Sequence, residues 1–267
     1  MQRQAVVAGQ FYAGSSRQLR EDLAEMIPES TVRRRVIGII APHAGYIYSG
    51  AIAGQVYAAI EIPSTVLIIG PNHHGAGAAA ALYPDGEWRT PLGTIPINPR
   101  LNSLLLDSVP YLQADVVAHQ QEHSLEVQVP FIQYLQPDAS ICAICLGHGD
   151  FAALSRIGEG VAAAIKDYGE DVLIVASSDM THYESAESAR RKDNLALARV
   201  LNFDPEGLLQ ICRQERITMC GVMPAAVMLV ASSCLGATHA ELAAYGTSGD
   251  VTGDDRQVVG YAAVSVW

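Results

Sequence analysis

The sequence predicts an α/β fold in which a mainly parallel or mixed central sheet is flanked by helices. Short apolar runs typical of buried strands alternate with helical stretches along most of the chain. Hydrophobic residues make up 49% of the sequence and charged residues 17%, which is typical of a globular protein and not of a disordered one. The 267 residues contain no low-complexity linker, repeat or abrupt change in composition, so we expect a single domain over residues 1–267.

The individual elements follow from the spacing of apolar residues. Strands are expected where short, often β-branched apolar runs occur, and helices where apolar residues recur at spacings of three and four. The expected strands lie at the start of residues 6–12 and at residues 36–40, 65–69, 139–146, 171–176, 241–245 and 259–266. The expected helices cover residues 16–27, 50–60, 99–109, 121–135, 151–167, 185–201, 205–213 and 222–234.

Turn and cap residues place the ends of several elements. Pro42 cannot donate to a β-ladder and should end its strand, and Ser49 is expected to cap the helix that follows. Turn signals within residues 78–96 predict a hairpin-like excursion, and Pro130 should interrupt or kink its helix. Residues 247–256 are expected to form a polar loop.

Charge and hydropathy exclude several classes of partner. The formal net charge of −11 argues against nucleic acid or an anionic membrane surface. The longest apolar run, residues 222–231, contains Pro224 and is too short to span a bilayer. The N-terminus has too few apolar residues for a signal-peptide core, so we expect a cytoplasmic protein with neither membrane nor nucleic-acid partners.

Histidines gather at the carboxyl ends of predicted strands, where ligands bind in open α/β sheets. Five of the eight occur there, namely His43, His73, His74, His148 and His182. The turns APHAG and GPNHHG, in which proline and glycine fix the backbone, favour a metal or catalytic site, because imidazole is a common ligand of iron, zinc and copper. His148 and His239 are better explained as ordinary polar loop residues.

A third metal ligand must come from elsewhere in the chain, and the residues alone leave Cys220, Asp179, Glu122 and Glu126 open. Cys220 precedes a predicted helix, whose dipole would lower the thiol pKa, although a lone cysteine there can equally be a small buried residue.

Two further segments contain candidate catalytic or substrate-facing residues. In SSDMTH, Asp179 and His182 could form an acid–base couple, or the aspartate could simply cap a turn. The segment EHSLE lacks the two histidines at i and i+4 of a zincin helix, which leaves Glu122 and His123 a supporting or substrate-facing role. No serine-hydrolase elbow, P-loop or dinucleotide motif occurs.

Taken together, the motifs resemble those of the Memo family in both sequence and order. They are AGQFYAG, APHAGYIYSG, GPNHHG, QEHSLEVQVPF, SSDMTHY and ITMCGVMP. The resemblance covers almost the whole chain and departs at Ala13, where the family commonly has proline. It implies a fold like that of class III extradiol dioxygenases, which hold non-haem Fe(II) with two histidines and a carboxylate. It also suggests a radical SAM protein and an AMMECR-type protein as partners, because the three are often encoded together.

The resemblance also assigns roles to individual residues. His43 and His74 match the metal histidines, and Cys220 stands where the dioxygenases have a carboxylate. Asp179, His182 and His123 match residues lining the same pocket and are the expected catalytic residues, and the resemblance makes His73 an adjacent residue that does not bind the metal. The expected substrate-binding residues are His73, Tyr46 and Glu122. Because a thiolate is a softer ligand than a carboxylate, dioxygenase activity does not follow from the fold.

Three functions remain open from the sequence. The first is a redox enzyme with one metal ion, iron or copper favoured over zinc, acting on an unidentified small molecule or peptide. The second is a module that binds a peptide or protein in a cleft whose metal site is vestigial. The third is a zinc hydrolase, which a His-His-Cys site with an open position would allow.

Overall fold

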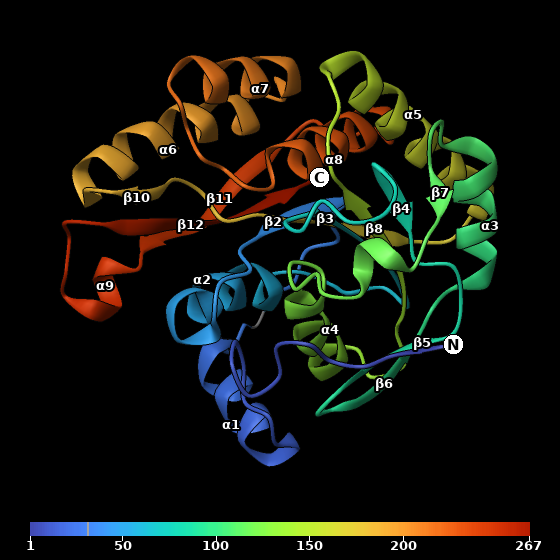
Figure 1. Ribbon diagram of the computed structural model, residues 1–267, viewed down its shortest axis with the longest axis horizontal. Helices are drawn as coiled ribbons and strands as arrows, with labels where there is room; N and C mark the ends of the chain where they lie inside the picture. Colours follow the sequence, from blue (N-terminus) through green and yellow to red (C-terminus); the bar gives the residue numbers. More distant parts are fainter. Residues whose placement is uncertain (31) are drawn as a thin grey trace.

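A computed structural model describes residues 1–30 and 32–267, and a nine-stranded mixed sheet runs through its centre (Figure 1). The strands are β1 (Gln2–Arg3), β2 (Gly38–Ala41), β3 (Thr65–Pro71), β4 (Ala80–Leu82), β5 (Glu87–Thr90), β6 (Gly93–Pro96), β7 (Gln113–Ala114), β8 (Ser140–Leu146), β9 (Val172–Ser177), β10 (His182–Glu184), β11 (Ala240–Thr247) and β12 (Val258–Val266). In the central sheet the order is β10-β12-β2-β9-β3-β8-β4-β7, with β11 paired to β12. A smaller sheet has the order β1-β5-β6 and contains the expected hairpin.

Helices alternate with these strands as the sequence predicts. They are α1 (Ser16–Met26), α2 (Tyr46–Ala58), α3 (Pro99–Ser108), α4 (Val129–Leu135), α5 (Phe151–Tyr168), α6 (Ala186–Leu201), α7 (Pro205–Gln214), α8 (Val222–Cys234) and α9 (Gly249–Thr252), with 3-10 helices η1 (Val117–His119) and η2 (Glu126–Gln128). The predicted mixed α/β sheet with flanking helices is confirmed. None of the helices described is long and apolar enough to cross a membrane.

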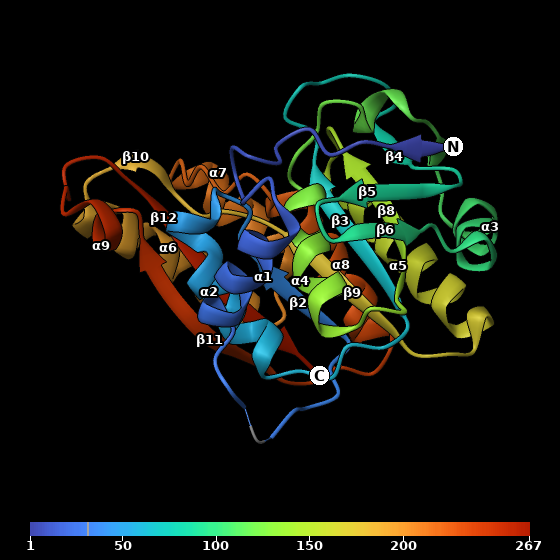
Figure 2. The ribbon, with the colours of Figure 1, turned by 90° about the horizontal axis from the view of Figure 1, so that it is seen from below.

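The heart of the sheet is parallel and buried on both faces. β2, β9, β3 and β8 lie side by side in parallel, and every residue of β3 is buried. Alternate side chains of β3 therefore enter different cores. Val66 and Ile68 pack towards α1, α2 and α4, whereas Leu67 and Ile69 pack towards α3, α5 and α8. Figure 2 shows α1, α2 and α4 lying over one face of the sheet.

The parallel arrangement brings the carboxyl ends of β2, β3 and β9 to one edge of the sheet. The turns that follow these strands carry His43, His73 and Asp179. Chain segments far apart in sequence are therefore brought together at this edge, which matches the prediction from strand ends.

The predicted strand within residues 6–12 is wrong. The carbonyl of Val7 accepts from the backbone N–H groups of Gln10 and Phe11, so the chain turns here. The N–H groups of Val6 and Val7 donate to the carboxylate of Glu126 instead of to a strand. The buried carboxylate of Glu126 therefore accepts the hydrogen bonds that a neighbouring strand would accept in a sheet.

Three other local predictions need correction. Helix α2 begins at Tyr46, because its N–H donates to the carbonyl of Phe11, and Ser49 lies inside the helix. Residues 121–125 are not helical, and Pro130 lies in the first turn of α4 instead of kinking a longer helix. The polar loop at 247–256 contains the short helix α9.

Candidate metal centre

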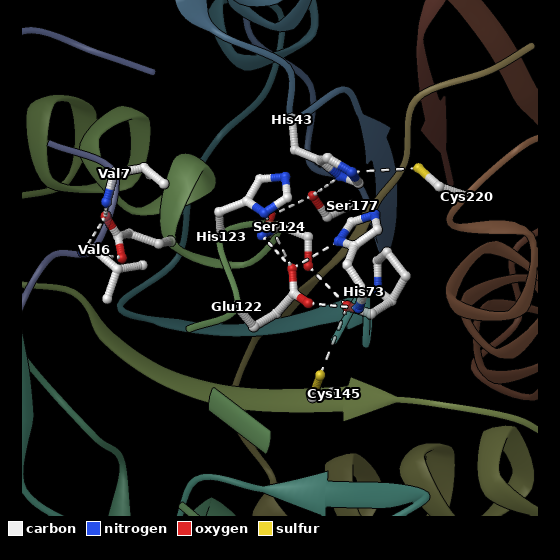
Figure 3. Close-up of polar contacts among 12 residues, drawn as sticks. Val6, Val7, His43, His73, Glu122, His123, Ser124, Cys145, Ser177 and Cys220 are labelled. Carbon is white, nitrogen blue, oxygen red and sulfur yellow. Dashed lines mark hydrogen bonds and ion pairs between the residues drawn. The ribbon is translucent and has the colours of Figure 1, made fainter. Parts of the chain in front are cut away.

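The turns after β2, β3 and β9 place several possible metal ligands together (Figure 3). Donor atoms of His43, His73 and Cys220 lie within 4.8 Å of one another. The backbone N–H groups of His43 and Ala44 donate to Oδ1 of Asp179 at 2.7 and 3.3 Å, which ties the turn after β2 to the turn after β9. The structure therefore contains a candidate metal-binding group at the edge predicted from the sequence.

His43 is only 2% exposed, and both of its ring nitrogens have a neighbour. Nδ1 lies 2.9 Å from Oγ of Ser177, and Nε2 lies 3.3 Å from Sγ of Cys220. Burial, together with the nearby His73, lowers the pKa of His43 to about 3. The imidazole is therefore neutral at physiological pH, the form in which histidine binds a metal.

His73 is held by the carboxylate of Glu122. Its backbone N–H donates to Oε2 at 2.6 Å, and its ring Nδ1 lies 2.8 Å from Oε1. Burial by itself would lower the pKa of His73, but the hydrogen bond and charge of Glu122 outweigh it and raise the pKa. Burial would likewise raise the pKa of Glu122, yet hydrogen bonds from His73 and from the N–H of Ser124 bring it well below its usual range. Glu122 is thus a buried, ionised group that orients the imidazole.

The thiol of Cys220 has a pKa above its usual value, contrary to the expectation from the helix dipole. Burial raises it most, and the carboxylate of Asp179 raises it further. The hydrogen bond from the N–H of Asp179 to Sγ, at 3.2 Å, and the start of α8 do not offset these effects. Because a thiol binds metal as the thiolate, a bound cation would have to supply the compensating charge.

Asp179 and His182 lie beside Cys220, and donor atoms of the three are within 4.8 Å of one another. Burial raises the pKa of Asp179, although it accepts hydrogen bonds from two backbone N–H groups. Nδ1 of His182 lies 3.0 Å from the carbonyl oxygen of Thr218, which can only accept. Nδ1 therefore carries a proton, and in the neutral imidazole the lone pair is on Nε2.

His123 completes a cluster of three imidazoles. Its ring stacks on His73 with centroids 4.8 Å apart and an interplanar angle of 16°, and it meets the edge of His43 at 5.6 Å. Phe11 covers it with ring centroids 4.8 Å apart. Burial and the nearby His43 lower the pKa of His123 to about 4, so this imidazole is also neutral at physiological pH.

The structure brings His73, and not His74, into the group with His43 and Cys220. His74 is exposed and belongs to none of the candidate metal-binding groups found among the described residues. His73 is also exposed as a residue, but its double contact with Glu122 holds its ring beside His43 and Cys220.

Two residues predicted to bind substrate are buried in the structure. Tyr46 is buried in the core, with its hydroxyl donating to the carbonyl of Val127 at 2.7 Å. The side chain of Glu122 has no exposed surface, and its oxygens are engaged by His73 and Ser124. The polar atoms of both side chains therefore have partners within the protein, and Glu122 acts on His73.

Several residues of the centre were missed by the sequence reasoning. Ser177 contacts His43, Thr218 contacts His182, and Phe11 covers His123. Ser177 lies in the conspicuous SSDMTH segment and could have been considered. Thr218 contacts His182 twice, because its hydroxyl accepts from the backbone N–H of His182 at 2.7 Å and its carbonyl lies against Nδ1. For the contact through the carbonyl a sequence offers no signal.

Comparisons with known proteins agree with the motifs. The family described as Memo-like protein matches residues 3–265. A MEMO1 family protein of Methanosarcina barkeri is 41% identical, with 99% of each chain covered. One of Methanopyrus kandleri is 37% identical, with 99% of this chain and 98% of that protein covered, and one of Thermotoga petrophila is 38% identical, with 98% of each covered.

The fold has a counterpart among solved structures. The crystal structure of uncharacterized protein JW3007 from Escherichia coli K12 superposes with a TM-score of 0.54 over 86% of this chain and 99% of that one, at 15% identity. This likeness concerns the fold alone. The family match and the relatives together establish that the chain belongs to the Memo family.

Proposed function

We propose that this chain is a metal-dependent redox enzyme in which His43, His73 and Cys220 hold one ion of iron or copper. The observation that carries the proposal is the way both histidines are held. Each has Nδ1 against a protein oxygen, from Ser177 or Glu122, which leaves Nε2 as the nitrogen available to a ligand. Metal-binding histidines in proteins are held in the same way.

The donor set fits a transition metal. Imidazole nitrogen suits iron, copper and zinc, and a thiolate favours the softer of these ions. A bound cation would also offset the burial that keeps the Cys220 thiol protonated. When bound, iron or copper would supply one-electron redox chemistry at this position. Zinc would suit the same donors, so the identity of the metal separates the redox enzyme from a hydrolase.

The residues around the group are suited to proton transfer. Nε2 of His182 carries a lone pair and can accept a proton from a substrate, while Thr218 keeps Nδ1 protonated. Asp179, whose pKa burial raises, lies next to it and can stabilise the resulting imidazolium. His123 is neutral and half-buried, so it can accept a hydrogen bond from a ligand. The substrate, together with the radical SAM and AMMECR-type partners, remains a prediction.

Metal analysis of anaerobically purified protein tests the proposal. Wild type should contain stoichiometric iron or copper, and His43→Ala, His73→Ala and Cys220→Ala should each lose it. His74→Ala is the matched control, because it removes the adjacent, exposed histidine and should leave the metal in place. Retention of metal by His73→Ala together with its loss from His74→Ala would overturn the ligand assignment.

The metal found decides between the functions. Zinc in place of iron or copper would refute the redox proposal and favour hydrolysis. Absence of metal from wild type, even after anaerobic reconstitution, would refute it in favour of a binding module.

A further inference from the structure

Ser177, the last residue of β9, stands at a junction of three hydrogen bonds. Its buried Oγ lies 2.6 Å from the carbonyl oxygen of Ser124, 2.8 Å from Nε2 of Gln128 and 2.9 Å from Nδ1 of His43. Figure 3 shows it between His43 and Ser124. A hydroxyl has one proton to donate and two lone pairs with which to accept, so three contacts use its full capacity.

The direction of each hydrogen bond follows from the chemistry of the neighbours. The carbonyl of Ser124 can only accept, so the hydroxyl proton of Ser177 points to it. The same nitrogen of Gln128 also lies 3.3 and 3.0 Å from the carbonyl oxygens of Ala41 and Pro42. That atom must therefore be the amide NH₂, which donates to Ser177. The contact with His43 can then only be a donation from Nδ1–H of the imidazole to Ser177.

We propose that Ser177 is a positioning residue that fixes His43 as the Nδ1–H tautomer, so that Nε2 keeps its lone pair towards Cys220. Gln128 stabilises this arrangement, because its amide NH₂ donates to the second lone pair of the Ser177 hydroxyl. Its own Oε1 accepts from the hydroxyl of Tyr57 at 3.0 Å, which holds the amide in place. The consequence of the tautomer for metal binding rests on the proposed function, whereas the tautomer itself does not.

One peptide segment connects the residue that orients His43 with the residue that orients His73. The N–H of Ser124 donates to Oε1 of Glu122 at 2.8 Å, and its carbonyl accepts from Ser177. Glu122 in turn holds Nδ1 of His73. The backbone of Ser124 therefore connects the group that orients His43 with the group that orients His73.

The tautomer is measured directly by long-range ¹H–¹⁵N NMR of histidine-labelled, metal-free protein. In wild type, the ¹⁵N shifts of His43 should show a protonated Nδ1 and an unprotonated Nε2. Ser177→Ala removes the acceptor and should give a mixture with the Nε2–H form, whereas Ser177→Thr keeps the hydroxyl and should restore the wild-type pattern. Ser232→Ala, which removes another fully buried serine hydroxyl at a distant place in α8, serves as the control.

Metal affinity provides the second readout. Titration with Fe(II) or Cu(I) under anaerobic conditions should show a Kd raised by about 10- to 100-fold in Ser177→Ala, with Ser177→Thr and Ser232→Ala close to wild type.

Two outcomes would overturn the inference. They are an Nε2–H form of His43 in wild type and an unchanged tautomer in Ser177→Ala. An unchanged metal Kd beside a changed tautomer would overturn the consequence for metal binding. The wild-type spectrum decides the matter even if Ser177→Ala fails to fold. The expected tautomer in a wild-type protein that binds no metal would refute the proposed function and leave the role of Ser177 in fixing the tautomer intact.

Discussion

Glu126 anchors the N-terminal residues, and its replacement by alanine should be among the most damaging changes in the protein. Its carboxylate is 1% exposed and lies 2.6 Å from Nη1 of Arg3, whose side chain is 5% exposed. It also accepts from the hydroxyl of Tyr12 at 2.7 Å and from the N–H groups of Val6 and Val7. Removal of one partner of a buried ion pair leaves an uncompensated charge and costs about 3–5 kcal/mol. Total stabilities are about 5–15 kcal/mol, so Glu126→Ala should bring the protein close to unfolding.

Urea unfolding followed by circular dichroism measures this cost. Arg3→Met removes the other charge, so the double variant Arg3→Met/Glu126→Ala should lose less free energy of unfolding than the sum of the single variants. Glu21→Ala breaks the exposed Arg17–Glu21 pair and should cost no more than about 0.5 kcal/mol. A cost below about 1 kcal/mol for Glu126→Ala, or simple additivity with Arg3→Met, would refute the reasoning.

Three further variants test other features of the structure. Gly54→Ala should destabilise the protein strongly in urea unfolding, because a Cβ there would lie 2.0 Å from the carbonyl oxygen of Met26, whereas Gly147→Ala, with its nearest atom at 3.7 Å, should be tolerated. Burial lowers the pKa of His119 from 6.5 to about 4, so the unfolded state binds more protons between these values and stability should fall as the pH drops through them. His119→Leu should flatten that part of the stability–pH curve, and an unaltered slope would contradict the assignment. Tyr46→Phe should lower the free energy of unfolding by about 1 kcal/mol without loss of metal, because the Tyr46 hydroxyl donates to a backbone carbonyl. Loss of metal from this variant would instead show that Tyr46 acts directly in the site.

Much of the fold could be predicted because its signals are local. The run at residues 65–69 is apolar throughout, as a strand covered on both faces must be, and it forms the fully buried β3. The first helix ends within one residue of its expected boundary, since Leu19 and Leu23 at helical spacing enter the core. The strand expected at residues 6–12 does not form, because the conformation of this segment depends on a residue distant in sequence. Its backbone partners are supplied by Glu126, more than a hundred residues away.

The candidate site was predictable at the level of turns but not of atoms. Glycine and proline around His43 and His73 marked the right strand ends. Which of the two adjacent histidines joins His43 and Cys220 depends on the position of Glu122. Glu122 was expected in a helix, but it lies in a loop. The raised thiol pKa of Cys220 likewise reflects burial and a neighbouring carboxylate that no local pattern reveals.

The distance along the chain between the grouped donors has a consequence for biosynthesis. His43 and Cys220 are separated by 177 residues, and the intervening chain supplies His73 and its support. A growing polypeptide cannot assemble this group until residue 220 has left the ribosome and β9 has joined the sheet. Contacts of such long sequence separation form late, after the entropy of closing large loops has been offset by other interactions. Metal binding would therefore follow synthesis of nearly the whole chain. A bound metal ion would then indicate that the chain has folded.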